Sequence, residues 1–427
     1  MHDESTLQRE TVVRVARRLI PLIVISYLVA HIDRANIAFA ALTMNRDLGF
    51  SAYIYGWGAG IFFLGYALFE VPSNLILVRI GARIWIARIM ITWGILAGLM
   101  ATVTGPSSFL TLRFLLGVAE AGFWPGILLY LTFWFPARYR ARAIGALYLA
   151  VPASNVVAAA ISSTLLQLDG FLGLKGWQWV FIGEAVPALV LVPVVLRLLT
   201  DRPGVAAWLR PAQREWLEAE LQRERVEVER GGHLGLAQAL TDRRVLTLAI
   251  VAMLHLVSLT GLTFFMPQMV KALGTSTAMA AALTAIPYII GVIGPIAAGY
   301  SSDRLKERRW HYIGAMALAA LSLVCAGRVI SSYWLLLATS GAALGIYASK
   351  PCFWPIPSQF LTGVGAAAGI ALINSIANVG GYVGPLVVGW VKDSTHSFEA
   401  ALYFLAACAL ASALLAYVGT RTVGRAL

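Results

Sequence analysis

The chain has 427 residues, of which 59% are hydrophobic and only 13% are charged. A soluble globular domain has roughly 45–50% apolar and about 25% charged residues, so this composition excludes a water-soluble protein and predicts a membrane protein. The formal net charge of +12 does not indicate nucleic-acid binding, because the basic residues gather in short breaks between apolar segments and form no basic groove.

The first apolar segment, residues 19–42, carries two adjacent charges, Asp33 and Arg34. At about 1.5 Å per helical residue the segment is long enough to cross a hydrocarbon core of about 30 Å. A charge at that depth costs about 2.5–3.5 kcal/mol on insertion scales, so intramembrane charges usually line a polar cavity. The pair therefore predicts a transport pathway.

Further apolar segments of spanning length follow, with mostly short breaks between them. They cover residues 53–77, 84–103, 108–134, 142–167, 178–199, 245–270, 277–300, 311–330, 333–356, 365–391 and 399–419. Basic residues concentrate in alternate breaks, and by the positive-inside rule this alternation predicts that both termini are cytoplasmic. The polar N-terminus has no small-residue cleavage signal, so we expect it to be retained.

The break at residues 200–244 is longer and more polar than the others. Its core, PAQREWLEAELQRERVEVERGG, is dense in Glu and Arg at helical spacing, which predicts a solvated amphipathic helix on the cytoplasmic side. We expect this segment to tether two membrane halves, and a regulatory role is the alternative.

The two halves of the chain repeat. FWP at residues 123–125 recurs at 353–355, an offset of 230 residues, and AIG at 143–145 precedes AAG at 367–369 by 224. A near-constant offset of half the chain predicts two six-helix bundles, residues 1–199 and 245–427, related by an axis along the membrane normal. The predicted fold is an all-α membrane protein with twelve transmembrane helices in these two bundles.

Loop motifs of the chain resemble those of the major facilitator superfamily over essentially the whole length. VRIGAR at 78–83 is similar to the family's D-R-x-G-x-R loop, with Val78 in place of the acid, and G-x-x-S-D-R-x-x-x-R-R is complete at 299–309. The resemblance implies a cytoplasmic gate, for which the candidates are Arg79, Arg83, Asp303 and Arg304. We expect Asp303 with Arg304 to hold the outward-facing state.

Within that superfamily the chain resembles the anion:cation symporter family, particularly the branch that imports tartrate and related hydroxy-acids. The segments that carry the resemblance are HIDRANIAFAAL (31–42), FEVPSNLIL (69–77), WIARIMITWG (85–94), RFLLGVAEAGFWPG (113–126) and INSIANVGGYVGP (373–385). The fifth span lacks the Gly-Pro-rich motif of the superfamily's antiporters, which favours import over efflux.

An organic anion in a membrane cavity needs fixed cations, and arginine offers a planar fork of donors that matches a carboxylate. The intramembrane cations expected to contact substrate are Arg34, Arg113 and Lys350. For Arg34 the alternative is a permanent salt bridge to Asp33 or Glu120. For Arg113 and Lys350 the alternative is a structural role. Neutral groups expected to select substrate hydroxyls, or else to bond a neighbouring helix, are Tyr66, Asn155, Asn374 and Asn378.

The resemblance implies that Asp33 and Glu120 carry the coupled protons. Burial and a neighbouring arginine act in opposite directions on the proton affinity of a carboxyl group, so such a group responds to whether an anion occupies the arginine. The alternative is a static ion pair that orients Arg34 or Arg113. Glu70 and Glu184 are weaker candidates, for which a structural hydrogen bond or an interfacial position is expected.

The sequence therefore predicts a proton-coupled symporter of the bacterial inner membrane that imports a small organic anion by alternating access. The expected substrate is a hydroxy-dicarboxylate such as tartrate or a sugar acid. The alternatives are an importer of an aromatic carboxylate, such as hydroxyphenylacetate or phthalate, and a non-transporting sensor of organic acids. Because no cysteine or histidine has metal-ligand spacing, we expect no metal, no cofactor and no enzymatic activity. The expected partners are the carboxylate, protons and lipid around a monomer.

Overall fold

The computed structural model describes residues 2–230, 241–357 and 363–419, and the regular structure in these ranges is helical. The helices up to the long polar break are α1 (His2–Asp47), α2 (Ala52–Ile80), α3 (Ala82–Leu99), α4 (Pro106–Glu120), α5 (Phe123–Thr132), α6 (Ala137–Leu165) and α7 (Gly176–Leu198). Those that follow are α8 (Pro211–Arg230), α10 (Arg243–Lys271), α11 (Thr277–Leu283), α12 (Ala285–Arg304), α13 (Arg309–Arg328), α14 (Trp334–Phe353), α15 (Gly363–Thr395) and α16 (Glu399–Gly419).

Ten stretches of helix in the described ranges are long and apolar enough to cross a membrane. Two of them join consecutive helices, α4 with α5 and α11 with α12. Helices α1 and α14, which carry the predicted charged residues Asp33, Arg34 and Lys350, are not among the ten but pack along neighbours that are. With these two, the helices follow the predicted spans in order. The predicted polar helix of the long break is α8, and residues 231–240 of that break lie outside the described residues.

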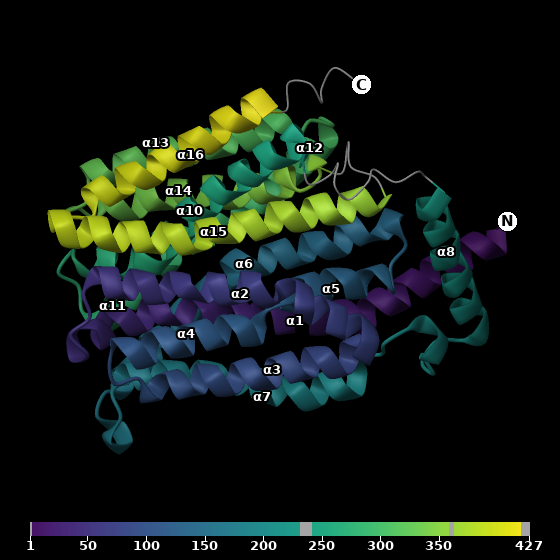
Figure 1. Ribbon diagram of the computed structural model, residues 1–427, viewed down its shortest axis with the longest axis horizontal. Helices are drawn as coiled ribbons and strands as arrows, with labels where there is room; N and C mark the ends of the chain where they lie inside the picture. Colours follow the sequence, from purple (N-terminus) through teal and green to yellow (C-terminus); the bar gives the residue numbers. More distant parts are fainter. Residues whose placement is uncertain (1, 231–240, 358–362, 420–427) are drawn as a thin grey trace.

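The helices form two adjoining groups (Figure 1). Helices α1 to α7 pack mainly on one another, and so do α10 to α16; between the groups, α2 packs on α15, α6 on α11 and α12, and α1 on α10. Helix α1 begins and α16 ends at the same end of the bundle, and α8 lies beyond that end (Figure 1). Helix α8 and the helical ends nearest the termini therefore share one side of the molecule.

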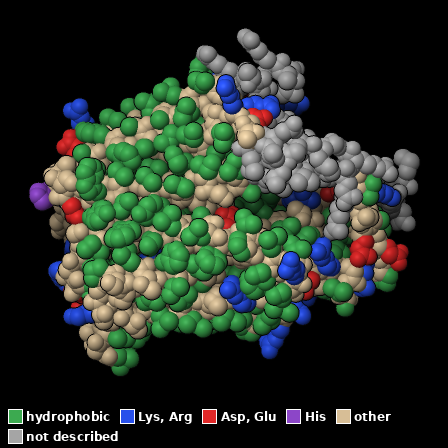
Figure 2. Space-filling view, viewed as in Figure 1, with side chains coloured by type: hydrophobic (Ala, Val, Ile, Leu, Met, Phe, Trp, Pro, Cys, Tyr) green, Lys and Arg blue, Asp and Glu red, His purple; other side chains and the backbone are tan. Residues whose placement is uncertain are grey.

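Hydrophobic side chains spread over much of the face seen in Figure 2, and basic side chains lie at its left edge and in its right-hand part, on the side of α8. Leu68 and Leu75 of α2, Ile293 of α12 and Leu337 of α14 are each more than half exposed. Apolar surface of this extent is unstable in water and is satisfied by lipid chains, while the helices satisfy their own backbone polar groups.

The fourth span is interrupted immediately after Glu120. Gly122 has a φ of 84°, and a Cβ there would lie 2.2 Å from the Ser73 hydroxyl, so only glycine fits this bend against α2. The interruption ends α4 inside the bundle and leaves Glu120 in its last turn. The negative end of the helix dipole at this point favours a cation nearby.

Candidate functional site

A buried ion pair links α1 to the end of α4. Arg34 donates from Nε to Glu120 Oε1 over 2.7 Å, and its Nη2 lies 2.6 Å from the same oxygen. Glu120 is 2% exposed, whereas the Arg34 side chain is 22% exposed. The Arg34 guanidinium also lies 5.2 Å and 5.0 Å from the ring centres of Phe62 and Tyr66 on α2. Of the two acids that the sequence offered to Arg34, the structure pairs it with Glu120.

Asp33 faces the other side of α1. Its Oδ2 accepts a hydrogen bond of 2.7 Å from Trp93 Nε1 on α3, and Oδ1 is buried with no hydrogen-bond partner among the described residues. Both residues are almost fully buried. Asp33 is thus an acid inside the first bundle, separated from the guanidinium of its sequence neighbour.

Arg113 is fully buried between α4 and α2. Its Nε donates to the carbonyl of Gly58 over 3.1 Å and its Nη2 to that of Ala59 over 3.3 Å, while the ring of Phe62 lies 5.1 Å from the guanidinium. These contacts direct the donors of Arg113 at the α2 backbone. They fit the structural alternative that the sequence left open, and substrate contact by Arg113 stays a prediction.

Lys350 lines a cavity of about 80 Å³ enclosed by helices of the second group. The walls come from α10, α13, α14 and α15 and include His255, Tyr312, Ser349, Phe353, Trp354 and Asn374. Ser349 and His255 Nδ1 are hydrogen-bonded over 3.1 Å, and His255 Nε2 is buried with no partner among the described residues. Lys350 therefore places a cation of the second group in a cavity wall, while Arg34 belongs to the first group.

Three predicted polar residues are engaged in contacts between the two groups of helices. Asn374 and Asn378 of α15 donate to Glu70 of α2, over 2.6 Å to Oε1 and 3.3 Å to Oε2. Asn155 of α6 donates over 3.4 Å to the Tyr347 hydroxyl of α14. The structure therefore brings the amides of Asn155, Asn374 and Asn378 to the interface between the groups, where each is bonded to a neighbouring helix.

At the end away from the termini, α2 and α15 are in direct contact. The Asp393 carboxylate accepts hydrogen bonds from the backbone N–H groups of Ala52 and Tyr53 at the start of α2, over 3.0 Å and 2.8 Å. A Cβ on Gly56 would lie 2.3 Å from the carbonyl of Pro385. Helices α2 and α15 are therefore in close backbone contact at this end.

The predicted gate residues lie at the opposite end. Asp303 is paired with Arg308, and Arg304 and Arg79 are exposed. The backbone N–H of Arg83 donates to Asp201 over 2.8 Å, so an acid beyond α7 caps α3. The family's loop motif has an acid where this chain has Val78. In this chain, Asp201 supplies a carboxylate at the start of α3. The gating role of these residues stays a prediction.

Four residues of the site did not emerge from the sequence: Trp93, His255, Tyr347 and Ser349. Each lies in an apolar span. His255 is a polar residue in such a span, and this could have marked it as a site residue from the sequence. The sequence gave no such signal for Trp93 and Tyr347, because aromatic residues in a span also pack in the core.

Comparisons with known proteins agree with this architecture. The sequence profile of the Major Facilitator Superfamily matches residues 23–369 and 248–426. The chain is 50% identical to an Agrobacterium vitis protein named "Putative tartrate transporter", over 98% of this chain and 96% of that protein. It is 42% identical to a quinolone resistance transporter of Acinetobacter baumannii, over 96% and 95% of the two chains.

A solved structure of the xylose transporter XylE from Escherichia coli, partially occluded and open inward, is similar with a TM-score of 0.74 at 14% identity. The similarity covers 94% of this chain and 98% of XylE. At this identity it concerns the fold alone, and it confirms the predicted all-α, twelve-span architecture.

Proposed function

This chain belongs to the Major Facilitator Superfamily, and from that premise we propose that it imports a small organic anion together with protons. The protein is a multi-pass membrane transporter and not an enzyme. The proposed substrate is a hydroxy-dicarboxylate such as tartrate or a sugar acid, in keeping with the name of the Agrobacterium vitis relative. The observation that carries the coupling is the buried pair of Arg34 and Glu120.

The coupling step follows from the charges of this pair. Glu120 attracts Arg34 strongly only while its carboxylate is ionised. A proton on Glu120 releases the guanidinium, which is then free to bind a substrate carboxylate. When the anion leaves, Arg34 returns to Glu120 and favours loss of the proton. One proton and one anion thus travel in the same direction. Asp33, held by Trp93, is the proposed second proton site.

The two helical groups each supply a cation. Arg34 comes from the first group and Lys350 from the second, so a dianion held by both draws the groups together. The amides of Asn374 and Asn378 then exchange Glu70 for substrate hydroxyls, and His255 offers a further hydrogen-bonding nitrogen from the cavity wall. We propose that residues 1–199 and 245–427 rock as two units around this site, joined by 200–244.

The test is uptake into liposomes by purified protein under an inward proton gradient. We expect accumulation of labelled tartrate or a sugar acid above the outside concentration. Asp33→Asn or Glu120→Gln should abolish this accumulation, whereas exchange of external for internal substrate partly survives. Glu120→Gln leaves Arg34 free to bind the anion, and Asp33→Asn leaves the Arg34–Glu120 pair in place. Glu184→Gln is the matched control, since this buried acid of the same bundle is bonded to Ser162.

Full accumulation by both the Asp33 and Glu120 variants would contradict the coupling assignment. Absence of gradient-dependent uptake across hydroxy-acids and aromatic acids would remove the transport proposal itself. Substrate binding without flux would instead favour the sensor alternative.

An aromatic carboxylate is the second candidate substrate. Tyr312, Phe353 and Trp354 line the cavity beside Lys350, which would suit an aromatic ring next to a cation. Competition of labelled tartrate uptake by hydroxyphenylacetate or phthalate distinguishes the two classes, since only a site that accepts the ring is inhibited at comparable concentration.

A further inference from the structure

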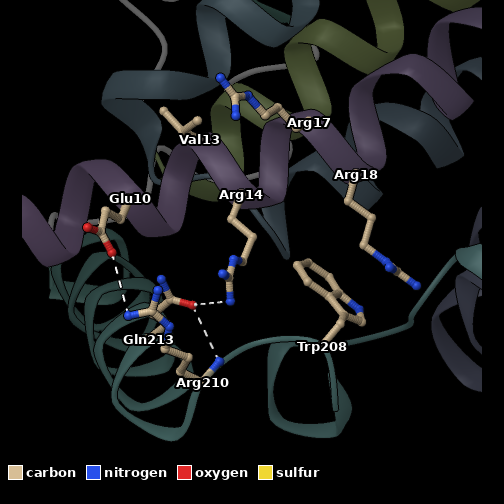
Figure 3. Close-up of a pocket in the computed structure, with 8 residues that line it drawn as sticks. All are labelled: Glu10, Val13, Arg14, Arg17, Arg18, Trp208, Arg210 and Gln213. Carbon is tan, nitrogen blue, oxygen red and sulfur yellow. Dashed lines mark hydrogen bonds and ion pairs between the residues drawn. The ribbon is translucent and has the colours of Figure 1, made fainter.

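A second, larger cavity lies outside the transport pathway, between the start of α1 and the segment that leads into α8. Its volume is about 630 Å³, and its lining comprises Glu10, Val13, Arg14, Arg17, Arg18, Trp208, Arg210 and Gln213. Four of these residues are arginines and one is an acid. Figure 3 shows Arg14 and Arg18 extending from one side of α1 toward Trp208 and Gln213.

Two buried donors on residues that line the cavity have no hydrogen-bond partner among the described residues. The single acid, Glu10, already lies 3.8 Å from Arg210. Gln213 is 1% exposed; its Oε1 accepts from Arg14 and from the backbone of Arg210, but its buried Nε2 has no partner among the described residues. The Nε of Arg18 is also buried and has no hydrogen-bond partner among the described residues. Buried donors of this kind are costly unless a ligand or water satisfies them.

One wall of the cavity is held rigidly. Trp208 stacks on Trp134 with 5.3 Å between ring centres, and its Nε1 donates to Thr200 over 3.1 Å. The Arg18 guanidinium lies 4.9 Å from the Trp208 ring. An anion entering here therefore meets an arginine already positioned by an aromatic wall, which reduces the entropy lost on binding.

The position along α1 indicates which anion the cavity takes. The apolar span of α1 begins at residue 19, directly after Arg18, so the arginines lie at the depth of lipid headgroups. Basic pockets at that depth attract anionic lipid, and arginine donors match phosphate oxygens. We propose that Arg14, Arg18 and Gln213 bind the phosphate of an anionic phospholipid and so fasten α1 to the segment leading into α8.

The proposal is tested by native mass spectrometry of the full chain in detergent, titrated with phosphatidylglycerol, with phosphatidylcholine, or with inorganic phosphate. We expect the wild-type protein to retain phosphatidylglycerol in preference to phosphatidylcholine. The double variant Arg14→Gln/Arg18→Gln should bind phosphatidylglycerol about tenfold more weakly, or worse. The matched control is Arg9→Gln/Arg223→Gln, which removes one exposed arginine of α1 and one of α8, both outside the cavity lining, and should bind normally.

A second variant keeps the test valid if the double variant does not fold. Gln213→Glu preserves the shape and the oxygen that accepts from Arg14, but it replaces the free N–H donor by a negative charge. We expect it to purify normally and to lose phosphatidylglycerol binding. Equal losses in the Arg9/Arg223 control would overturn the site, because the effect would then be general charge. Equal retention of both lipids, or tight binding of inorganic phosphate with no lipid preference, would overturn the phospholipid assignment.

Discussion

Arg34 and Arg113 illustrate how two similar residues take different roles. Both are intramembrane arginines of the first group, and the ring of Phe62 lies near each. Arg34 is partly exposed and paired with a carboxylate, whereas Arg113 is fully buried with donors on backbone carbonyls of α2. An arginine that must release its partner to bind substrate needs the first environment, and one that fastens two helices needs the second.

We therefore predict that Arg34→Ala and Arg113→Ala differ in kind. Arg113→Ala removes buried charged hydrogen bonds and costs about 1–3 kcal/mol of stability, so it should lower the thermal midpoint in detergent. Arg34→Ala leaves the buried Glu120 carboxyl without its cation, which favours the protonated acid, and the variant should lose substrate-induced stabilisation. Thermal unfolding of each variant with and without tartrate measures both effects. A large ligand-induced shift retained by Arg34→Ala would contradict its assignment.

At the scale of elements, α2 and α15 are in close contact at the end of the molecule away from the termini. Gly56 of α2 meets the backbone of Pro385, and Gly389 of α15 meets the backbone of Ala52. Small residues allow two helix backbones to approach closely, and the Asp393 cap then adds hydrogen bonds across the gap. A transporter that alternates must break this contact once in each cycle.

Gly56→Ala with Gly389→Ala should therefore open this end. A Cβ at these positions would lie 2.3 Å and 2.2 Å from backbone oxygens, so the helices must separate. A cost of about 1–3 kcal/mol for overpacking is enough to shift a two-state population by about tenfold. Spin labels at Tyr53 and Lys392 report the change as a longer interlabel distance. Gly314→Ala, where a Cβ meets nothing within 4 Å, is the control, and an unchanged distance in the Gly56/Gly389 variant would refute the idea.

At the scale of the whole molecule, the distribution of charge predicts the orientation in the membrane. The start of α1, the end of α16 and α8 share one end of the bundle (Figure 1). The basic breaks of the sequence belong to that end, which the positive-inside rule assigns to the cytoplasm. The closed contact of α2 with α15 would then face outward.

Reporter fusions test this orientation. Green fluorescent protein fused after Leu427 should fluoresce, since it folds in the cytoplasm. Alkaline phosphatase inserted in the break at 271–276 should be active, and the same enzyme inserted in 200–244 should be inactive. The reverse pattern at the two insertion points would show that the orientation is inverted and that the proposed import direction needs revision.

The sequence by itself determined the class of protein, the order of the twelve spans and the polar residues that stand out within them. These are local properties: span length, apolar content and the cost of an isolated charge in lipid are visible within a few helical turns. The near-constant offset between equivalent motifs also predicts that the two halves of the chain repeat.

Only the tertiary structure decided which partner each polar group takes. Asp33 and Arg34 are adjacent in the chain, yet a helix turns successive side chains about 100° apart, so one meets Trp93 and the other Glu120. Glu70 meets Asn374 across 304 residues of chain. Such pairings depend on how two helices are rotated and spaced against each other, and that is set by the packing of many apolar side chains and glycines together.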